Sequence, residues 1–261
     1  MKTLVKLNQV THRYDQRKTA GVTELNFSVN ENQCLCLIGP SGSGKTTTAK
    51  VIAGMISPKK GSVEVSPDTV MSYVPQNTNL PEQMSVFEYL FSILNKDKCN
   101  IDDDTKKENL IRTNLLLLNI SSEMNSPIES ISGGQRQRVI IASALIKNPN
   151  LIILDEPFGH LDEKLRSNLM IELFDLFKDK EIACLWVTHE TQQALAFSDR
   201  IILLNYGVIQ QDGSPKEVYQ SPKNLFCADF FGHNNSIAGK IISFSENKAL
   251  INALSKEFHV S

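Results

Sequence analysis

The segment Gly39-Pro-Ser-Gly-Ser-Gly-Lys-Thr46 constrains the fold of this chain more than any other part of the sequence. It matches the pattern GxxxxGK[ST] in full, and it stands between a short apolar run, Cys34–Ile38, and a helix-like stretch that extends to about Met55. Glycines allow successive backbone N–H groups to turn toward phosphate oxygens, and the N-terminus of the following helix adds partial positive charge. A strand, a phosphate-binding loop and a helix in this order predict a nucleotide-binding α/β domain.

The residues of this loop have separate expected tasks. Lys45 is expected to reach the β- and γ-phosphates of a nucleotide, and the hydroxyl of Thr46 is expected to bind Mg²⁺. The alternative is a glycine turn with a solvated lysine, but the full pattern arises by accident in a chain of ordinary composition on the order of 1% of the time. The expected ATP-binding residues in and beside the loop are Gly39, Pro40, Ser41, Gly42, Ser43, Gly44, Lys45, Thr46 and Thr47.

Short apolar runs separated by helix-like segments predict an α/β sheet that is wrapped on both faces. Residues 4–14 and 22–30 instead alternate apolar and polar side chains, as the strands of a half-buried antiparallel subdomain do. The apolar runs are 34–38, 151–154, 184–187 and 201–204, and a clear helix-like segment is 165–177.

Residues 77–148 are predicted to form a mainly helical insertion in this α/β domain. Within them, 86–94 and 108–118 have helical character, and 96–104 is a polar, acidic connection without a core pattern. Further along, 239–260 resembles a set of short strands. We therefore expect an inserted helical subdomain and a short β-like tail.

Two carboxylates, Asp155 and Glu156, follow the apolar run 151–154. A buried strand that ends in two acidic residues suits phosphoryl transfer. Asp155 is then expected to hold Mg²⁺ through its water shell, and Glu156 to polarise the attacking water. The alternative is an acidic pair that caps a helix before Pro157.

The segment Ile131-Ser-Gly-Gly-Gln135 heads another predicted helix, 135–146, and its two glycines leave backbone N–H groups facing outward. With the phosphate-binding loop and the carboxylate pair, it makes the chain resemble the ATP-binding-cassette (ABC) ATPases, the motor subunits of ABC transporters. In this family two cassettes pack head to tail, and the signature of one covers the γ-phosphate held by the other. The resemblance implies a RecA-like P-loop (Walker A) core, a homodimer, and a signature that acts in trans through Ser132, Gly133, Gly134 and Gln135.

The resemblance assigns three further positions. Gln76, in Tyr-Val-Pro-Gln, matches the Q-loop glutamine, which touches Mg²⁺ or the lytic water. His189, in Trp-Val-Thr-His, matches the switch histidine that contacts the γ-phosphate, and Tyr14 matches an aromatic residue that stacks on adenine. The implied catalytic residues are Lys45, Gln76, Glu156 and His189, and the implied Mg²⁺ ligands are Thr46, Gln76 and Asp155.

The likeness covers residues 1–235, which are expected to form one nucleotide-binding domain. It is closest to the motors of iron, polyamine and sugar importers, through 188–201, 207–219 and 222–232. The implied function is ATP binding and hydrolysis that drives solute import. The implied partners are a second copy of the chain, transmembrane permease subunits and a solute-binding protein.

Four features depart from the family pattern. Ile131 replaces the usual leucine, and Ser143 stands where an arginine is common. Gly159-His160 stands where a Ser-Ala pair is usual. Asp162 matches the family pattern and is expected at the dimer seam. The tail, 236–261, is short relative to the regulatory β-barrel of long importer motors, so a packed hairpin or a dimer contact is expected there.

Composition argues against other classes of protein. The net charge of -2 provides no global basic field, so no nucleic-acid partner is expected. The five cysteines form no CxxC pair, which favours reduced thiols over disulfides or a zinc site. The N-terminal residues lack the apolar core of a signal peptide, and no apolar run approaches the roughly 20 residues that span a bilayer. The expected location is the cytoplasm, peripheral on the inner face of the cell membrane.

Three alternatives to an importer motor stay open. An export or lipid-handling motor would share every catalytic residue, and only the resemblance over 207–232 argues against it. A soluble ABC ATPase of DNA repair needs a long coiled-coil insertion, but residues 77–131 leave room only for a compact helical domain. Translation factors typically carry two cassettes, and this sequence contains one. A non-catalytic nucleotide-binding regulator is disfavoured because Lys45, Asp155, Glu156 and His189 are all present.

Overall fold

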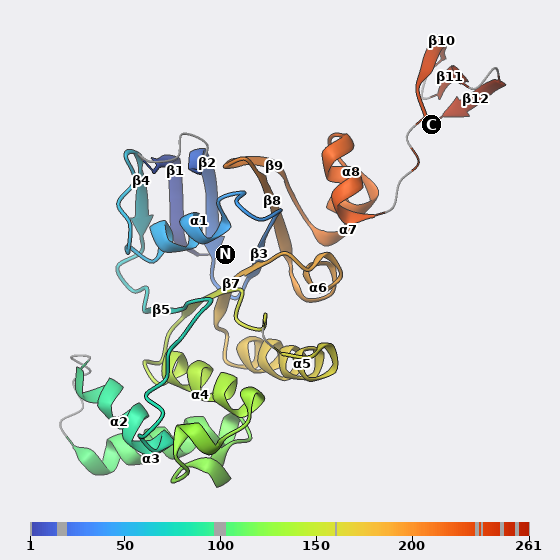
Figure 1. Ribbon diagram of the computed structural model, residues 1–261. Coiled ribbons are helices and arrows are strands. Elements are labelled where there is room, and N and C mark those ends of the chain that lie inside the picture. The colour runs from blue at the N-terminus through green and yellow to red at the C-terminus, as the bar shows by residue number, and fades with distance from the viewer. Residues whose placement is uncertain are drawn as a thin grey trace.

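The structure is a computed structural model, and the predicted α/β core lies at the centre of the molecule (Figure 1). The described residues are 2–14, 20–96, 103–159, 161–232, 235, 237–245, 248–253 and 256–260.

A six-stranded sheet forms this core, and its first five strands in spatial order run parallel. The last strand pairs antiparallel with its neighbour. Strands that are buried on both faces are expected to be almost wholly apolar, and four of these strands coincide with the short apolar runs of the sequence. In spatial order the strands are β5 (Met71–Val74), β6 (Leu151–Asp155), β7 (Ala183–Thr188), β3 (Cys34–Ile38), β8 (Arg200–Asn205) and β9 (Val208–Gly213).

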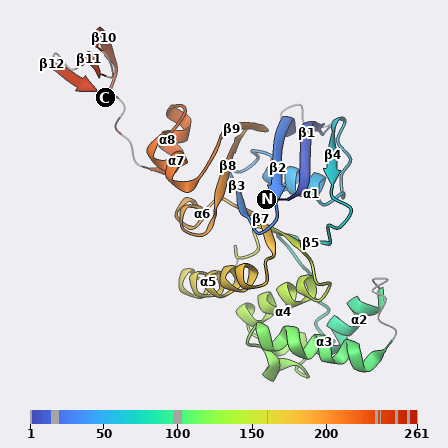
Figure 2. The same ribbon diagram turned by 180° about the vertical axis from the view of Figure 1, so that it is seen from behind.

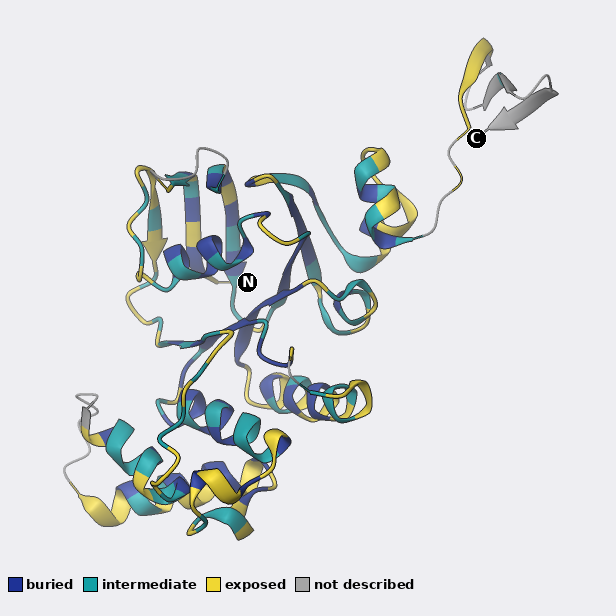
Figure 3. Ribbon diagram, in the orientation of Figure 1, coloured by how far each residue is buried: buried dark blue, intermediate teal, exposed yellow. Residues whose placement is uncertain are grey.

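Side chains that alternate along each central strand enter two separate cores. In β3, Leu35 and Leu37 pack with helix α1 (Lys45–Ile52), whereas Cys36 and Ile38 belong to the core that contains α5 (Glu163–Asp179) and α6 (Thr191–Phe197). This alternation is the period of two that any strand imposes. The central strands are accordingly buried on both faces, which Figure 3 shows as dark blue ribbon. The prediction of a sheet covered on both faces is confirmed.

An antiparallel sheet covers the α1 side of this core. It has the order β2 (Gly21–Asn30), β1 (Thr3–Arg13), β4 (Lys60–Val65), and β1 pairs with β2 as the alternating pattern predicted. The sequence analysis missed β4, because its residues are mostly exposed and only Val63 and Val65 are apolar. Their strand conformation depends on pairing with β1, a partner that is far away in sequence.

Helices dominate the chain between β5 and β6, and they form the lower part of Figure 1. The two expected helices are present, and the helix after the signature begins at Gly133 rather than Gln135, because Ser132 is its cap. The connection 97–102 lies outside the described residues. The elements are α2 (Val86–Lys96), α3 (Asp104–Leu117), η1 (Ser121–Glu123), η2 (Ile128–Ser130) and α4 (Gly133–Leu145).

The C-terminal part of the chain leaves the central sheet through α7 (Pro215–Gln220) and α8 (Leu225–Phe231). The short strands expected in 239–260 are present, although they form a three-stranded antiparallel sheet rather than a hairpin. In both views this sheet lies away from the body of the chain (Figures 1 and 2). Its strands are β10 (Gly239–Ser245), β11 (Lys248–Ala253) and β12 (Lys256–Val260).

Two further expectations concern the described residues. Cys34, Cys36, Cys184 and Cys227 are free thiols, as predicted, whereas Cys99 lies outside the described part of the chain. Within that same part, no helix combines the length and the apolar character of a bilayer-spanning segment.

Candidate functional site

The predicted phosphate-binding loop, carboxylate pair and histidine meet at the carboxyl ends of β3, β6 and β7. Parallel pairing causes this, because it brings the same ends of neighbouring strands to one edge of the sheet. A cavity of about 300 Å³ opens there. The residues that line it include Tyr14, Lys45, Thr46, Gln76 and Glu156.

Two loop glycines are required by close backbone packing. A Cβ atom at Gly39 would lie 2.2 Å from the carbonyl oxygen of Leu204. Gly44 has a φ of +103°, and a Cβ atom there would lie 2.8 Å from the carbonyl oxygen of Gly21. Other residue types would therefore displace the loop from the sheet edge. The glycine spacing of the motif reflects this packing as well as access of a ligand to the backbone.

The side chain of Lys45 is buried at the base of the loop, with 5% of its surface exposed. Its Nζ donates to the carbonyl oxygens of Gly39 at 2.8 Å and Pro40 at 3.1 Å, and it lies 3.8 Å from Oε1 of Glu156. Burial lowers the pKa of Lys45, and the negative charges of Glu156 and Asp155 oppose that shift. The ammonium group is thus held inside the loop by its carbonyl oxygens, and a bound phosphate would give it a further negative partner.

The loop residues that face the cavity of about 300 Å³ fit a polar ligand. They are Ser41, Gly42, Gly44, Lys45, Thr46 and Thr47. The ammonium of Lys45 and the start of the following helix are groups that attract phosphate oxygens, so these residues fit a nucleotide. The buried Oγ of Ser43, which has no hydrogen-bond partner among the described residues, does not line this cavity.

Asp155 is fixed by two hydroxyl groups. Thr46 Oγ1 donates to its Oδ1 at 3.0 Å, and Tyr73 Oη donates to its Oδ2 at 2.9 Å. Burial raises the pKa of Asp155, and the hydrogen bonds from Tyr73 and Thr46 act in the opposite direction. Burial, with the nearby Asp155 charge and hydrogen bond, also raises the pKa of Tyr73. The tyrosine hydroxyl therefore keeps its proton, which it donates to Asp155.

The same oxygens fit a magnesium ion. Mg²⁺ prefers hard oxygen ligands and commonly binds through one or two carboxylates together with substrate phosphates. Thr46 and Asp155 supply a hydroxyl and a carboxylate within hydrogen-bond distance of each other. Over the described ranges, no cluster of three His, Cys, Asp or Glu residues could hold a metal ion by itself. A cation at this site would therefore depend on the nucleotide for part of its ligand shell.

Sequence reasoning missed Tyr73. It lies opposite Ile153 in the parallel pair of β5 and β6, so Asp155, two residues further on, faces the same side of the sheet. The sequence around this residue shows only a tyrosine in a short strand near Gln76. It does not reveal that β6, which carries Asp155, is the neighbouring strand.

Glu156 has the left-handed backbone conformation, with a φ of +48°. This conformation is costly for a residue with a Cβ atom and often occurs at functional sites. Two predicted site residues contact its carboxylate: Gln76 Nε2 donates to Oε2 at 3.1 Å, and His189 Nδ1 lies 3.5 Å from Oε1. Three residues that the sequence placed in one site thus meet around this carboxylate.

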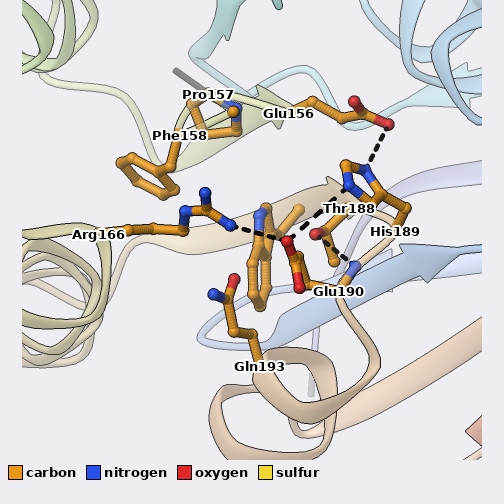
Figure 4. Close-up of a pocket in the computed structure, with 10 residues that line it drawn as sticks. Glu156, Pro157, Phe158, Arg166, Thr188, His189, Glu190 and Gln193 are labelled. Atoms are coloured by element: carbon orange, nitrogen blue, oxygen red, sulfur yellow. Dashed lines mark hydrogen bonds and ion pairs between the residues drawn. The ribbon is translucent and has the colours of Figure 1, made fainter. Parts of the chain in front are cut away.

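His189 lies beside a second, smaller cavity of about 60 Å³ (Figure 4). Its Nε2 is 3.9 Å from Oε1 of Glu190, and the same oxygen accepts a hydrogen bond from Nη1 of Arg166 at 2.7 Å. Neither Arg166 nor Glu190 was predicted as a site residue. Their contact joins the start of α5 to the end of β7, two segments that only the fold brings together.

The signature residues lie elsewhere. Ser132 Oγ accepts from the backbone N–H of Gln135 at 3.3 Å, and Gln135 Oε1 accepts from that of Ser132 at 2.8 Å, which forms a capping box. A Cβ atom at Gly134 would lie 2.9 Å from the end of the Leu165 side chain, so a larger residue there would displace that side chain, whereas Gly133 is exposed. None of the four residues lines the cavity of about 300 Å³ beside Lys45. Their action in trans stays a prediction.

Two other expected residues, Tyr14 and Asp162, have clear positions. Tyr14 lies at the cavity with its hydroxyl 3.4 Å from Thr47 Oγ1, and the edge of the His12 ring packs against it. Asp162 caps α5, because its Oδ1 accepts from the backbone N–H of Leu165 at 2.9 Å. Its place at a dimer seam stays a prediction.

The departures from the family pattern leave the described site residues in place. Ile131 is buried, and Ser143 Oγ donates to the carbonyl oxygen of Ile140 at 2.7 Å. His160 lies outside the described residues.

Comparisons with known proteins show which family the chain belongs to. The family model described as ABC transporter matches residues 22–159. The spermidine/putrescine import ATP-binding protein PotA of Fusobacterium nucleatum is 37% identical over 239 residues, which is 88% of this chain and 63% of the relative. The protein of the same name from Borreliella afzelii is 36% identical over 245 residues, which is 90% of this chain and 70% of the relative.

Solved structures show the same fold. The chain is similar to cbiO1 of Clostridium perfringens, part of an ABC transporter complex, with a TM-score of 0.76 and 21% identity over 85% of this chain and 92% of that one. It is also similar to a nucleotide-free ATP-binding cassette of an ABC transporter, with a TM-score of 0.74 and 20% identity over 89% of this chain and all of the other. The sequence match and the fold together show that the chain belongs to the ABC transporter family.

Proposed function

We propose that this chain is the ATP-binding and ATP-hydrolysing motor subunit of an ABC importer. The observation that carries the proposal is the convergence of Lys45, Thr46, Gln76 and Glu156 around one cavity. Asp155 accepts a hydrogen bond from Thr46 beside this cavity, and His189 contacts Glu156. These groups suit phosphoryl transfer, in which the protein contributes mainly positioning and charge stabilisation. The names of the relatives support an importer over an export motor or a soluble ABC ATPase.

The site residues have distinct tasks in this mechanism. Backbone N–H groups of the loop and the Lys45 ammonium bind the triphosphate, and Tyr14 stacks on adenine. Thr46, Asp155 and Gln76 hold Mg²⁺, which when bound neutralises charge on the phosphates. Glu156 accepts a proton from the attacking water, since Gln76 and His189 keep its carboxylate at the cavity.

A second copy of the chain completes the site. We infer that two subunits pack head to tail, so that Ser132, Gly133, Gly134 and Gln135 of one subunit meet the γ-phosphate held by the other, with Asp162 at the seam. Support comes from the exposure of Ser132 and Gly133 and from their absence at the cavity within one chain. Two ATP molecules would then lie at the seam, and their hydrolysis would reopen the dimer.

The remaining parts of the proposal concern assembly. We infer that residues 1–235 act as one nucleotide-binding domain, that 77–148 form its helical subdomain, and that 236–261 are a separate extension. Movement would reach transmembrane permease subunits through the groove beside Gln76, on the cytoplasmic face of the membrane. Polyamines delivered by a solute-binding protein are the first cargo to test, because two relatives are named for spermidine and putrescine import.

Mg²⁺-dependent ATP hydrolysis by the purified chain tests the enzymatic part of the proposal. Hydrolysis should stop when EDTA removes the metal, and Lys45→Ala should abolish it because the ammonium partner of the phosphates is lost. Phosphate release is the measurement. Phosphate release by Lys45→Ala at a rate close to that of the wild-type chain would contradict the proposal. Uptake of labelled spermidine into vesicles with the permease subunits then separates import from export.

Tyr73→Phe should raise the Mg²⁺ concentration for half-maximal hydrolysis by about three- to tenfold. The reason is that a hydrogen bond to a charged group contributes about 1.5–3 kcal/mol, part of which Asp155 recovers from the bound cation. Hydrolysis across a Mg²⁺ titration is the measurement. Tyr219→Phe, an exposed tyrosine on α7, is the matched control. An equal response of the two variants would remove Tyr73 from the metal site.

A further inference from the structure

The guanidinium group of Arg166 joins the turn before α5 to the segment after β7. Arg166 is in the first turn of α5, and its Nη2 donates back to the carbonyl oxygen of Leu161 at 2.9 Å. Its Nη1 donates to Oε1 of Glu190 at 2.7 Å, as Figure 4 shows. A short charge-assisted contact of this kind is among the stronger hydrogen bonds of proteins. The start of α5 therefore holds the Glu190 carboxylate directly.

Glu190 Oε1 lies between two nitrogen-bearing side chains. It is 2.7 Å from Arg166 and 3.9 Å from Nε2 of His189, whose other ring nitrogen is 3.5 Å from Glu156 Oε1. The imidazole ring thus has a carboxylate on each side. Because Arg166 is the nearer partner of Glu190, it limits how closely this carboxylate approaches the ring.

The surroundings of Arg166 show that its position is constrained. Only 18% of its side chain is exposed, and its buried Nε has no hydrogen-bond partner among the described residues. Arg166, Glu190 and His189 all line the cavity of about 60 Å³, which is large enough for a water molecule. A buried N–H without a partner destabilises the folded state. A contact that only fixed the start of a helix would therefore not be expected to include one.

We propose that Arg166 is a positioning residue that keeps the Glu190 carboxylate away from His189, so that the imidazole can face the γ-phosphate. This inference rests on the proposed ATPase function. Leu161 immediately precedes Asp162, which we assign to the dimer seam. A movement of this turn changes the support of the guanidinium group, and with it the distance between Glu190 and His189. Arg166 thereby couples the seam to the switch histidine within one subunit.

The first test asks whether removing the charge of Glu190 restores the activity that Arg166→Ala loses. Arg166→Ala should lower kcat by about tenfold, the lower end of the effect expected for a lost hydrogen bond to a charged group. The KM for ATP should change by less than about twofold, because residues such as Tyr14 and Lys45 are untouched. Adding Glu190→Gln should return kcat to within about threefold of wild type, since the amide no longer attracts the imidazole as a charge does. A double variant that is no faster than Arg166→Ala would overturn the proposal.

The second test observes the imidazole ring without nucleotide. In the full chain, the NMR signals of the His189 ring, assigned with His189→Asn, should shift in Arg166→Ala and return toward wild type in the double variant. Arg138→Ala is the matched control, because Arg138 also contacts a carboxylate, Glu172, and a carbonyl oxygen, both at 2.7 Å, with 16% of its side chain exposed. Thermal melting establishes that each variant is folded.

The two readouts separate failure of this inference from failure of the proposed function. If the wild-type chain hydrolyses no ATP while Arg166→Ala shifts the His189 signals, the function is wrong and the contact between the side chains is supported. If the His189 signals stay unchanged in Arg166→Ala, or shift equally in Arg138→Ala, the positioning role is wrong even in an active ATPase.

Discussion

Glu156→Gln is expected to lower ATP hydrolysis by roughly 10²–10⁴, the usual contribution of a positioned general base. The substitution keeps the size of the side chain and one oxygen acceptor, but the amide cannot take a proton from water. Nucleotide binding should persist, because Lys45 and the backbone groups of the loop are unchanged. The substitution also removes the charge that lies 3.8 Å from Lys45, which leaves the ammonium with more attraction for phosphate.

ATP that is bound but not cleaved should trap the closed dimer. Size exclusion with ATP and Mg²⁺ should therefore show a dimer for Glu156→Gln, and phosphate release should be nearly absent. Glu64→Gln is the control, since Glu64 is exposed on β4 and its side chain bonds to Asn8. Hydrolysis by Glu156→Gln at a rate close to that of Glu64→Gln would remove Glu156 from the role of base.

A mixture of two damaged subunits is expected to form a partly repaired dimer. Lys45→Ala damages the phosphate-binding loop, and Ser132→Arg blocks the signature at the exposed cap of α4. If the signature acts in trans, the mixed dimer has one composite site with both lesions and one site with neither. Each mutant homodimer has two damaged sites. Mixing should therefore increase the amount of closed dimer that contains ATP.

Dimer formation should be measured before hydrolysis in this experiment, because cooperation between the two sites could suppress turnover even where one site is intact. Subunits with different tags allow the mixed species to be purified and its bound ATP to be counted. About one ATP per mixed dimer is expected. If mixing produces no more nucleotide-bearing dimer than either mutant alone, Lys45 and Ser132 do not meet across a head-to-tail seam.

The sequence predicted those site features that depend on local chain geometry. The phosphate-binding loop is recognisable because a strand, glycines at set spacing and a helix follow one another directly. Asp155 and Glu156 were predicted because they follow an apolar run, and His189 was assigned by resemblance to the family. Parallel pairing is what brings the three to one edge of the sheet. The helices were predicted with boundary differences of a few residues, and Ser132 shows why. Its role as a cap is decided by hydrogen bonds, which the apolar pattern does not record.

Tertiary structure alone decided which side chains support those residues. Tyr73 reaches Asp155 because β5 lies beside β6 in one register, and a shift of one residue would turn it to the other face. Arg166 reaches Glu190 because α5 packs beside the end of β7. These partners are 82 and 24 positions apart in the chain. Periodicity describes the face that a residue occupies, whereas contact across elements depends on register and packing, which form only when the whole core is assembled.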